Sequence, residues 1–203
     1  MPLTIGIIGF QGDVSEHAEL LKRAAARLGV EISIVEVRKR SQLDSVNAII
    51  IPGGESTTMY KLLKLYSMYD RIRELAHNGL PVMGTCAGLI LISSRTNDDR
   101  VEGMGLMGTE VERNAYGRQI DSFMDEIEVK GLGKYKAVFI RAPIISSPGN
   151  DEVLAVHDGK PVMVRNGKIL GLTFHPELTK DTRVHEYFIR MIEGEGYTSS
   201  GNK

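Results

Sequence analysis

The single cysteine of the chain, Cys86, stands in a pattern typical of a nucleophile. In the stretch from Leu80 to Ser93, LPVMGTCAGLILIS, a short apolar strand is expected to end at Gly84, and an apolar helical run follows Gly88. A strand, a sharp turn and a helix around G-x-C-x-G form a nucleophile elbow with a thiol in place of a hydroxyl. Glycines two residues either side of the nucleophile avoid collisions in the strained turn, and the following helix favours the thiolate. The alternative is a buried structural cysteine.

A thiol nucleophile needs a general base, and His175 is the best placed of the five histidines. It follows a predicted strand, Ile169–Phe174, and is held by Pro176. Glu177 stands two residues further on, where a carboxylate could orient the imidazole and stabilise its cation. A plain turn is the competing interpretation of His-Pro-Glu taken alone. Solvent-facing roles are expected for the other histidines, which are His17, His77, His157 and His185.

The glycine pair at Gly53 and Gly54 follows another buried strand and allows a close approach of the backbone. Gly54 can supply one N–H to an oxyanion, and the second would come from Ala87, just past the nucleophile. A glycine turn followed by an N-capping Ser56 is the alternative, and both can hold.

Nucleotide and metal sites are not favoured by the sequence. No Gly-Lys-Ser/Thr follows a glycine loop, and GIIGFQG lacks the spacing of a dinucleotide fingerprint. The sequence has a single cysteine and no pair of histidines at the spacing of metal ligands, so metal ligation is not favoured. Neither a metal nor a cofactor is expected.

The composition is that of an ordinary globular protein, with 42% hydrophobic and 25% charged residues in 203. The formal net charge of −1 gives no electrostatic reason to expect nucleic acid or a membrane surface as a partner. One cysteine cannot form an internal disulfide, and no basic region precedes the apolar residues of the N-terminus. A cytoplasmic protein without a membrane segment is expected.

Alternating strand and helix patterns fill the first half of the chain. They predict an α/β fold with three layers, helices about a mostly parallel sheet. Strands are expected at 3–9, 31–37, 46–51 and 82–83, and helices at 14–28, 56–78 in two pieces around 66–70, and after the elbow.

The second half is expected to add antiparallel strands beside that sheet. The hairpin signals are Asp158–Gly159 and Asn166–Gly167, and a long functional loop with a short strand near 108–112 is expected at 95–125. Strand-like runs occur at 125–129, 137–140, 152–157, 161–165 and 168–173, and a closing helix at 182–193. One domain, 1–193, and a flexible tail, 194–203, are predicted.

Ligands of open α/β sheets gather outside the carboxyl ends of the strands. Polar or glycine-rich loops stand at four such ends: Gln11–Asp13, Gly53–Thr57, Thr85–Gly88 and His175–Glu177. The sequence therefore predicts that these four loops converge on one site.

Three motifs together, GTCAG, PGGEST and HPE, resemble the class I glutamine amidotransferases, whose triad is Cys–His–Glu and whose fold is flavodoxin-like. Other stretches narrow the resemblance to the glutaminase subunit of pyridoxal 5′-phosphate synthase, over nearly the whole chain to about residue 192. These stretches are GFQG at 9–12, PGGESTTM at 52–59, ERNAYGRQ at 112–119, DSF at 121–123, VFIRAP at 138–143 and FHPELT at 174–179.

The resemblance implies hydrolysis of L-glutamine to glutamate and ammonia, with ammonia passed to a separate synthase subunit that builds the cofactor from a pentose phosphate and a triose phosphate. It implies a γ-glutamyl thioester on Cys86, with His175 as acid and base and Glu177 as its orienter. The glutamine-binding positions it implies are Gly54, Glu55, Ser56, Arg113, Ile140 and Arg141. Gln11 would help shape the oxyanion region when the complex forms. Asp13 departs from the pattern, since a small apolar residue is expected there.

Three alternatives stay open on the sequence alone. Within the same chemistry, the chain could be the glutaminase of imidazole-glycerol-phosphate synthase, which RNAYGRQ and FIRAP disfavour. It could be a catalytically silent amidotransferase-like module that only binds a partner, or a cysteine peptidase on a similar fold. Solvated surface charge is the alternative role for Arg113 and Arg141.

Overall fold

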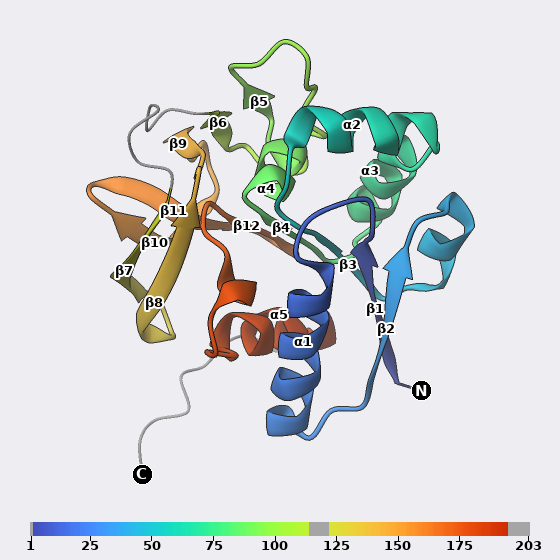
Figure 1. Cartoon of the computed structure of the whole chain (residues 1–203), viewed down its shortest axis with the longest axis horizontal. Coiled ribbons are helices and arrows are strands. Elements are labelled where there is room, and N and C mark those ends of the chain that lie inside the picture. The colour runs from blue at the N-terminus through green and yellow to red at the C-terminus, as the bar shows by residue number, and fades with distance from the viewer. Residues whose placement is uncertain (1, 114–121, 195–203) are drawn as a thin grey trace.

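A nine-stranded sheet forms the centre of the computed structural model, which describes residues 2–113 and 122–194 (Figure 1). Five neighbouring strands, β2, β1, β3, β4 and β12, run parallel to one another. The remaining four strands, β11, β10, β7 and β8, continue the sheet, and each is antiparallel to the neighbour before it. In spatial order the strands are β2 (Ile32–Val37), β1 (Leu3–Ile8), β3 (Ala48–Ile51), β4 (Val82–Thr85), β12 (Ile169–Leu172), β11 (Lys160–Asn166), β10 (Glu152–His157), β7 (Ser122–Val129) and β8 (Gly133–Ile140).

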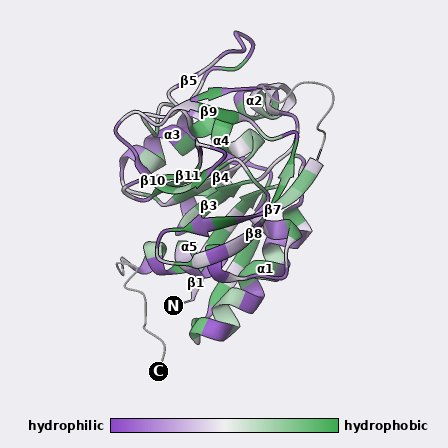
Figure 2. Cartoon of the chain, turned by 90° about the vertical axis from the view of Figure 1, so that its left-hand side faces the viewer, coloured by the Kyte–Doolittle hydropathy of each residue, from purple (hydrophilic) through white to green (hydrophobic). Residues whose placement is uncertain are grey.

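Helices cover both faces of the parallel half, which gives the expected three layers. α1 (Val14–Leu28) and α5 (Arg183–Glu193) pack on one face, and the other face carries α2 (Ser56–Leu65), α3 (Tyr69–His77) and α4 (Ala87–Ile92). Strand side chains alternate between the two cores: Ala48 and Ile50 join the α1–α5 side, whereas Ile49 and Ile51 join the other. Figure 2 shows apolar residues along the strands of the sheet, and both apolar and polar residues on α1.

Several predicted boundaries agree closely with the structure. α1 spans the predicted 14–28 and ends at Gly29, whose left-handed backbone (φ 69°) caps the helix. The predicted break in the run 56–78 is present, because α2 ends at Leu65 and α3 begins at Tyr69.

The run 168–173 was predicted as an antiparallel addition, and this is wrong in part. β12 is antiparallel to β11, as the Asn166–Gly167 turn requires, but it is parallel to β4 on its other side. All four of its residues are buried, so it suits a central position where both faces of the sheet are covered. β12 is the strand that joins the parallel and antiparallel halves.

A second sheet of three strands takes two of them from the 95–125 segment, where a long loop with one short strand was predicted, and the third from further along the chain. It consists of β5 (Arg95–Thr96), β6 (Glu110–Glu112) and β9 (Ile144–Ser147). The short strand is therefore present, but β5 and β9 were not predicted. Residues 114–121, which carry most of ERNAYGRQ, lie outside the described residues, as does the predicted tail after Gly194. The described residues also form two 3₁₀ helices, Arg40–Ser45 and Pro176–Leu178. Among the described helices, none combines the length and the apolar character needed to cross a membrane.

Candidate active site

The backbone at Cys86 has the geometry of a sharp elbow between β4 and α4. Its φ of 51° and ψ of −103° are unusual for a residue with a side chain, and its N–H donates to Leu172 O at 2.8 Å. The flanking glycines are sterically required. A Cβ on Gly88 would lie 2.0 Å from Ile51 O, and one on Gly84 would lie 2.6 Å from the carbonyl carbon of Gly88. The neighbouring strands therefore fix where the sulfur stands.

His175 and Glu177 leave the carboxyl end of β12, next to the elbow. The Nδ1 of His175 donates to Glu177 Oε1 at 2.7 Å, and both residues are buried. The imidazole also lies against the glycine loop after β3, because a Cβ on Gly53 would stand 2.4 Å from its Cε1. Glycine at this position therefore makes room for the ring.

The imidazole of His175 interacts with Cys86 as well as with Glu177. Burial alone would lower the pKa of His175, but hydrogen bonds with Cys86 and with Glu177 outweigh that effect and raise the pKa to about 10. At neutral pH the ring is therefore positively charged beside the sulfur, the arrangement that makes a thiol nucleophilic. Burial raises the pKa of Glu177, and the bond from His175 opposes this rise.

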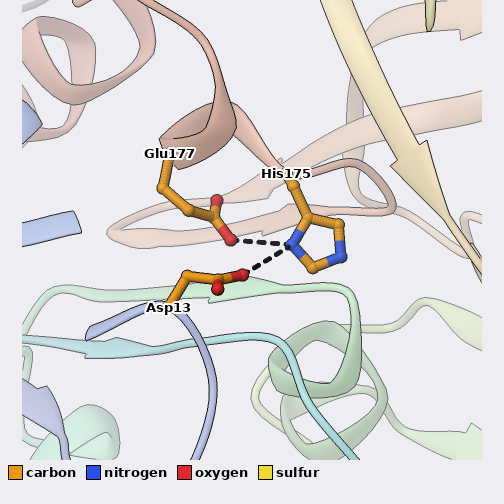
Figure 3. A group of neighbouring side chains, drawn as sticks. All are labelled: Asp13, His175 and Glu177. Carbon is orange, nitrogen blue, oxygen red and sulfur yellow. Dashed lines mark hydrogen bonds and ion pairs between the residues drawn. The ribbon is translucent and has the colours of Figure 1, made fainter. Parts of the chain in front are cut away.

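Figure 3 shows a second carboxylate, that of Asp13, pointing at the same nitrogen of His175. Asp13 Oδ2 lies 3.8 Å from Nδ1. Asp13, which stands where a small apolar residue was expected, therefore contacts the histidine of the site. One imidazole and two carboxylates within 4.8 Å are donor types that metals accept. However, the 2.7 Å bond from Nδ1 to Glu177 is the contact that an acid–base histidine needs.

The loop after β3 is fixed by Gln11. Its side-chain amide donates to Glu55 O at 3.1 Å, and its Oε1 accepts from Glu55 N at 2.9 Å. Gly54, the residue before Glu55, has a φ of 133°, which favours glycine. Gln11 is thus placed to set the orientation of the peptides that were predicted to bind the oxyanion.

The four loops predicted to converge surround one cavity of about 420 Å³. Two predicted residues stand behind its wall: Glu177 holds His175, and Gln11 holds Glu55. The predicted residues that line the cavity are Gly54, Glu55, Ser56, Cys86, Ala87, Arg113, Ile140, Arg141 and His175, and they are joined by Gly12, Asp13, Ile90 and Pro143.

A charged pair, Arg113 and Glu55, lines the same cavity as the sulfur. Arg113 bonds to Glu55 at 2.8 Å and also to Asp98, a residue that the sequence analysis did not select. Burial would raise the pKa of Glu55, but hydrogen bonds from Thr57 and Thr58 outweigh it and lower the pKa to about 2. Glu55, not the predicted Ser56, is the N-cap of α2, because its longer side chain reaches both N–H groups.

The backbone at Ile140 and Arg141 closes the cavity near the sulfur. The thiol of Cys86 contacts Ile140 O at 3.8 Å, and Arg141 has a positive φ of 42°. The sequence signal VFIRAP therefore marks a place where β8 ends in an unusual backbone conformation beside the nucleophile.

Two histidines that were predicted to face solvent are fully buried. His17 on α1 and His185 on α5 pack together behind Glu177, with His17 Nδ1 3.0 Å from His185 Nε2. Periodicity placed both on helices correctly but could not show that α1 and α5 press these faces together over the sheet. They are functional candidates that the sequence analysis missed.

These buried histidines predict acid destabilisation. Burial lowers the pKa of His185 to about 3, so between pH 6.5 and 3 the unfolded chain binds a proton that the folded chain does not. The free energy of unfolding should fall by about 1.4 kcal/mol per pH unit in this range because of His185. Urea unfolding of the wild type and of His185→Phe at pH 7, 6 and 5 measures the effect as the difference between the two proteins. A difference that stays constant with pH would contradict the prediction.

The fold and the cavity are those expected of a class I glutamine amidotransferase: three α/β/α layers with a thiol on a strand–helix elbow. A model described as the SNO glutamine amidotransferase family matches residues 7–194. The chain belongs to this family.

Individual relatives agree with this assignment. The chain is similar to "Pyridoxal 5'-phosphate synthase subunit PdxT" of Thermoplasma acidophilum, with 54% identity over 96% of this chain and 95% of that protein. The protein of the same name from Thermoplasma volcanium is 55% identical over 98% of each chain. A solved structure, "Crystal structure of glutamine amidotransferase", superposes with a TM-score of 0.83 at 42% identity and covers 93% of this chain and 98% of that one.

Proposed function

We propose that this chain is the glutaminase subunit of a pyridoxal 5′-phosphate synthase. It hydrolyses L-glutamine to L-glutamate and ammonia and passes the ammonia to a synthase subunit in the cytoplasm for vitamin B6 biosynthesis. The near full-length similarity to proteins of that name supports the assignment. The observation that carries the chemistry is the imidazole of His175, which is bonded to Glu177 and lines the same cavity as the thiol of Cys86.

The first half of the reaction forms a thioester. The sulfur of Cys86 attacks the carboxamide carbon of glutamine, and the resulting oxyanion is held by the N–H groups of Gly54 and Ala87. The C–N bond then breaks, and His175 gives its proton to the leaving nitrogen so that ammonia departs. The positive charge of His175 at neutral pH suits this step.

The second half releases glutamate. His175, now neutral, takes a proton from water, the hydroxide attacks the thioester carbon, and the C–S bond breaks. Glu177 holds the ring through Nδ1 during both halves, so that Nε2 carries the proton to and from the reacting atoms. Glu177 is a positioning residue in this scheme.

The charged pair of Arg113 and Glu55 in the cavity wall selects the amino-acid end of glutamine. The guanidinium of Arg113 pairs with the α-carboxylate, and the carboxylate of Glu55 pairs with the α-ammonium. The two side chains bond to one another at 2.8 Å, so they exchange that bond for substrate contacts. Asp98 holds the guanidinium during the exchange, while Ser56 and the backbone of Ile140 and Arg141 complete the lining.

Replacing Arg113 with lysine is expected to raise the KM for glutamine by about 10- to 100-fold, the equivalent of one hydrogen bond to a charged group. Lysine keeps the charge but loses the planar fork that contacts two groups at once. Arg100→Lys is the matched control, because Arg100 also bonds to Asp98 but does not line this cavity. Steady-state ammonia release measures both variants, and an unchanged KM in the Arg113 variant would contradict the assigned role.

The assay that tests the proposed function is ammonia release from glutamine by the full chain, with and without the synthase subunit. We expect low activity alone and stimulation by the synthase, because free release of ammonia would waste glutamine. Full turnover without any partner would count against coupling, and no turnover in either condition would count against the enzyme. Asparagine, whose side chain is one methylene shorter than that of glutamine, is the control for the substrate length that the cavity accepts.

A further inference from the structure

The carboxylate that orients His175 has a second buried oxygen, and a histidine from another helix faces it. Glu177 Oε1 takes the bond from His175, whereas Oε2 lies 3.4 Å from His17 Nε2. No described group, His17 included, forms a well-aligned hydrogen bond to Oε2. A buried carboxylate oxygen without a donor is costly, so the contact with His17 has an energetic consequence for Glu177.

The histidine pair has two possible proton arrangements. Both rings are neutral near pH 7, because burial lowers the pKa of His17 and that of His185. A neutral imidazole carries one N–H, so the 3.0 Å contact between His17 Nδ1 and His185 Nε2 uses a proton from only one side. Which ring donates decides what His17 Nε2 can offer to Glu177.

The surroundings favour His185 as the donor. If His17 donated from Nδ1, His185 would carry its proton on Nδ1, a buried atom without a partner among the described residues, and Glu177 Oε2 would also lack a donor. If His185 donates from Nε2, its Nδ1 is unprotonated. A buried acceptor nitrogen without a partner is less costly than a buried N–H without an acceptor. His17 then carries its proton on Nε2, where it faces Glu177 Oε2 and, at 3.5 Å, Thr85 Oγ1.

We propose that His17 is a positioning residue for glutamine hydrolysis, which donates from Nε2 to Glu177 Oε2 while His185 fixes its tautomer. The inference rests on the proposed triad of Cys86, His175 and Glu177. With one oxygen held by each histidine, the carboxylate cannot rotate away from His175. The donor also favours the ionised carboxylate, which burial disfavours. The charged and titratable groups that face His17 are Glu177, His175 and His185.

The test compares His17→Gln with His17→Asn in the complex of the full chain with its synthase subunit. Glutamine can place an amide N–H near the position of Nε2, whereas the shorter asparagine reaches only the position of Nδ1. We expect His17→Asn to lower kcat by about 10- to 100-fold, the equivalent of one hydrogen bond to a charged group, and to leave KM within about twofold. The kcat of His17→Gln should be at least about fivefold higher than that of His17→Asn.

The pH profile separates positioning from simple packing. Without the donor, Glu177 is protonated more easily, so the acid limb of kcat should move to higher pH in His17→Asn and less so in His17→Gln. His77→Gln, on the exposed end of α3, is the control for a histidine change outside the site. Thermal unfolding of each variant shows that it is folded at the assay temperature.

Two results would overturn the inference. One is equal kcat loss in the glutamine and asparagine variants with an unmoved acid limb, which would mean that His17 only fills space. The other is wild-type kcat in both. Cys86→Ala is measured in the same assay: if it remained active, the triad itself would be wrong, whereas an inactive Cys86→Ala beside either result refutes only the role of His17.

Discussion

Replacing Cys86 with alanine is expected to lower glutamine hydrolysis by about 10⁴-fold or more while the chain stays folded. Removal of the nucleophile leaves only the binding and oxyanion contacts, which cannot form the thioester. The side chain is small and Cys86 is only 7% exposed, so loss of one sulfur should change packing little. The readouts are ammonia release in the presence of the synthase and thermal unfolding.

Cys86→Ser is the informative companion to this variant. Its hydroxyl stands at the same elbow but is a poorer nucleophile beside the same imidazole, so activity should also be nearly lost. Turnover close to that of the wild type in Cys86→Ala would refute the assignment of the nucleophile. It would also revive the interpretation of the chain as a binding module with a structural cysteine.

Replacing His175 with glutamine is expected to lower kcat by about 10³- to 10⁴-fold, since the acid and base of both half-reactions is lost. A second, partner-independent readout is the rate at which iodoacetamide alkylates the thiol. Because Cys86 is the single cysteine, the mass of the labelled chain reports this site alone. Alkylation should slow in His175→Gln, because no imidazolium remains beside the sulfur.

His77→Gln is the matched control for this substitution, and its alkylation rate should equal that of the wild type. If His175→Gln were alkylated as fast as the wild type, the imidazole of His175 would not activate the thiol of Cys86. The same experiment distinguishes an active enzyme from a silent module, since a silent site has no activated thiol.

The sequence was sufficient to predict the elements and the site loops where the cause was local. Gly29 ends α1 because a left-handed backbone is needed there, and Gly84 and Gly88 flank Cys86 because a Cβ would collide with backbone. The carboxyl ends of parallel strands meet at one edge, so convergence of the loops followed from topology. The roles of these residues in catalysis stay predictions until the variants are measured.

What the sequence did not predict depends on contacts between distant segments. Nothing local shows that His17 and His185 meet, since they are 168 positions apart. Asp98 was missed because its significance comes only from its contact with Arg113. The parallel side of β12 was missed because a hairpin signal determines one neighbour of a strand and not the other.

The position of β12 has a consequence for the order in which the catalyst is made. Cys86 is synthesised long before β12, the strand that pairs beside β4, and before His175 and Glu177, which follow that strand. A nascent polypeptide therefore holds its cysteine without the groups that activate it. The activated thiol is therefore assembled only after β12 has paired with β4.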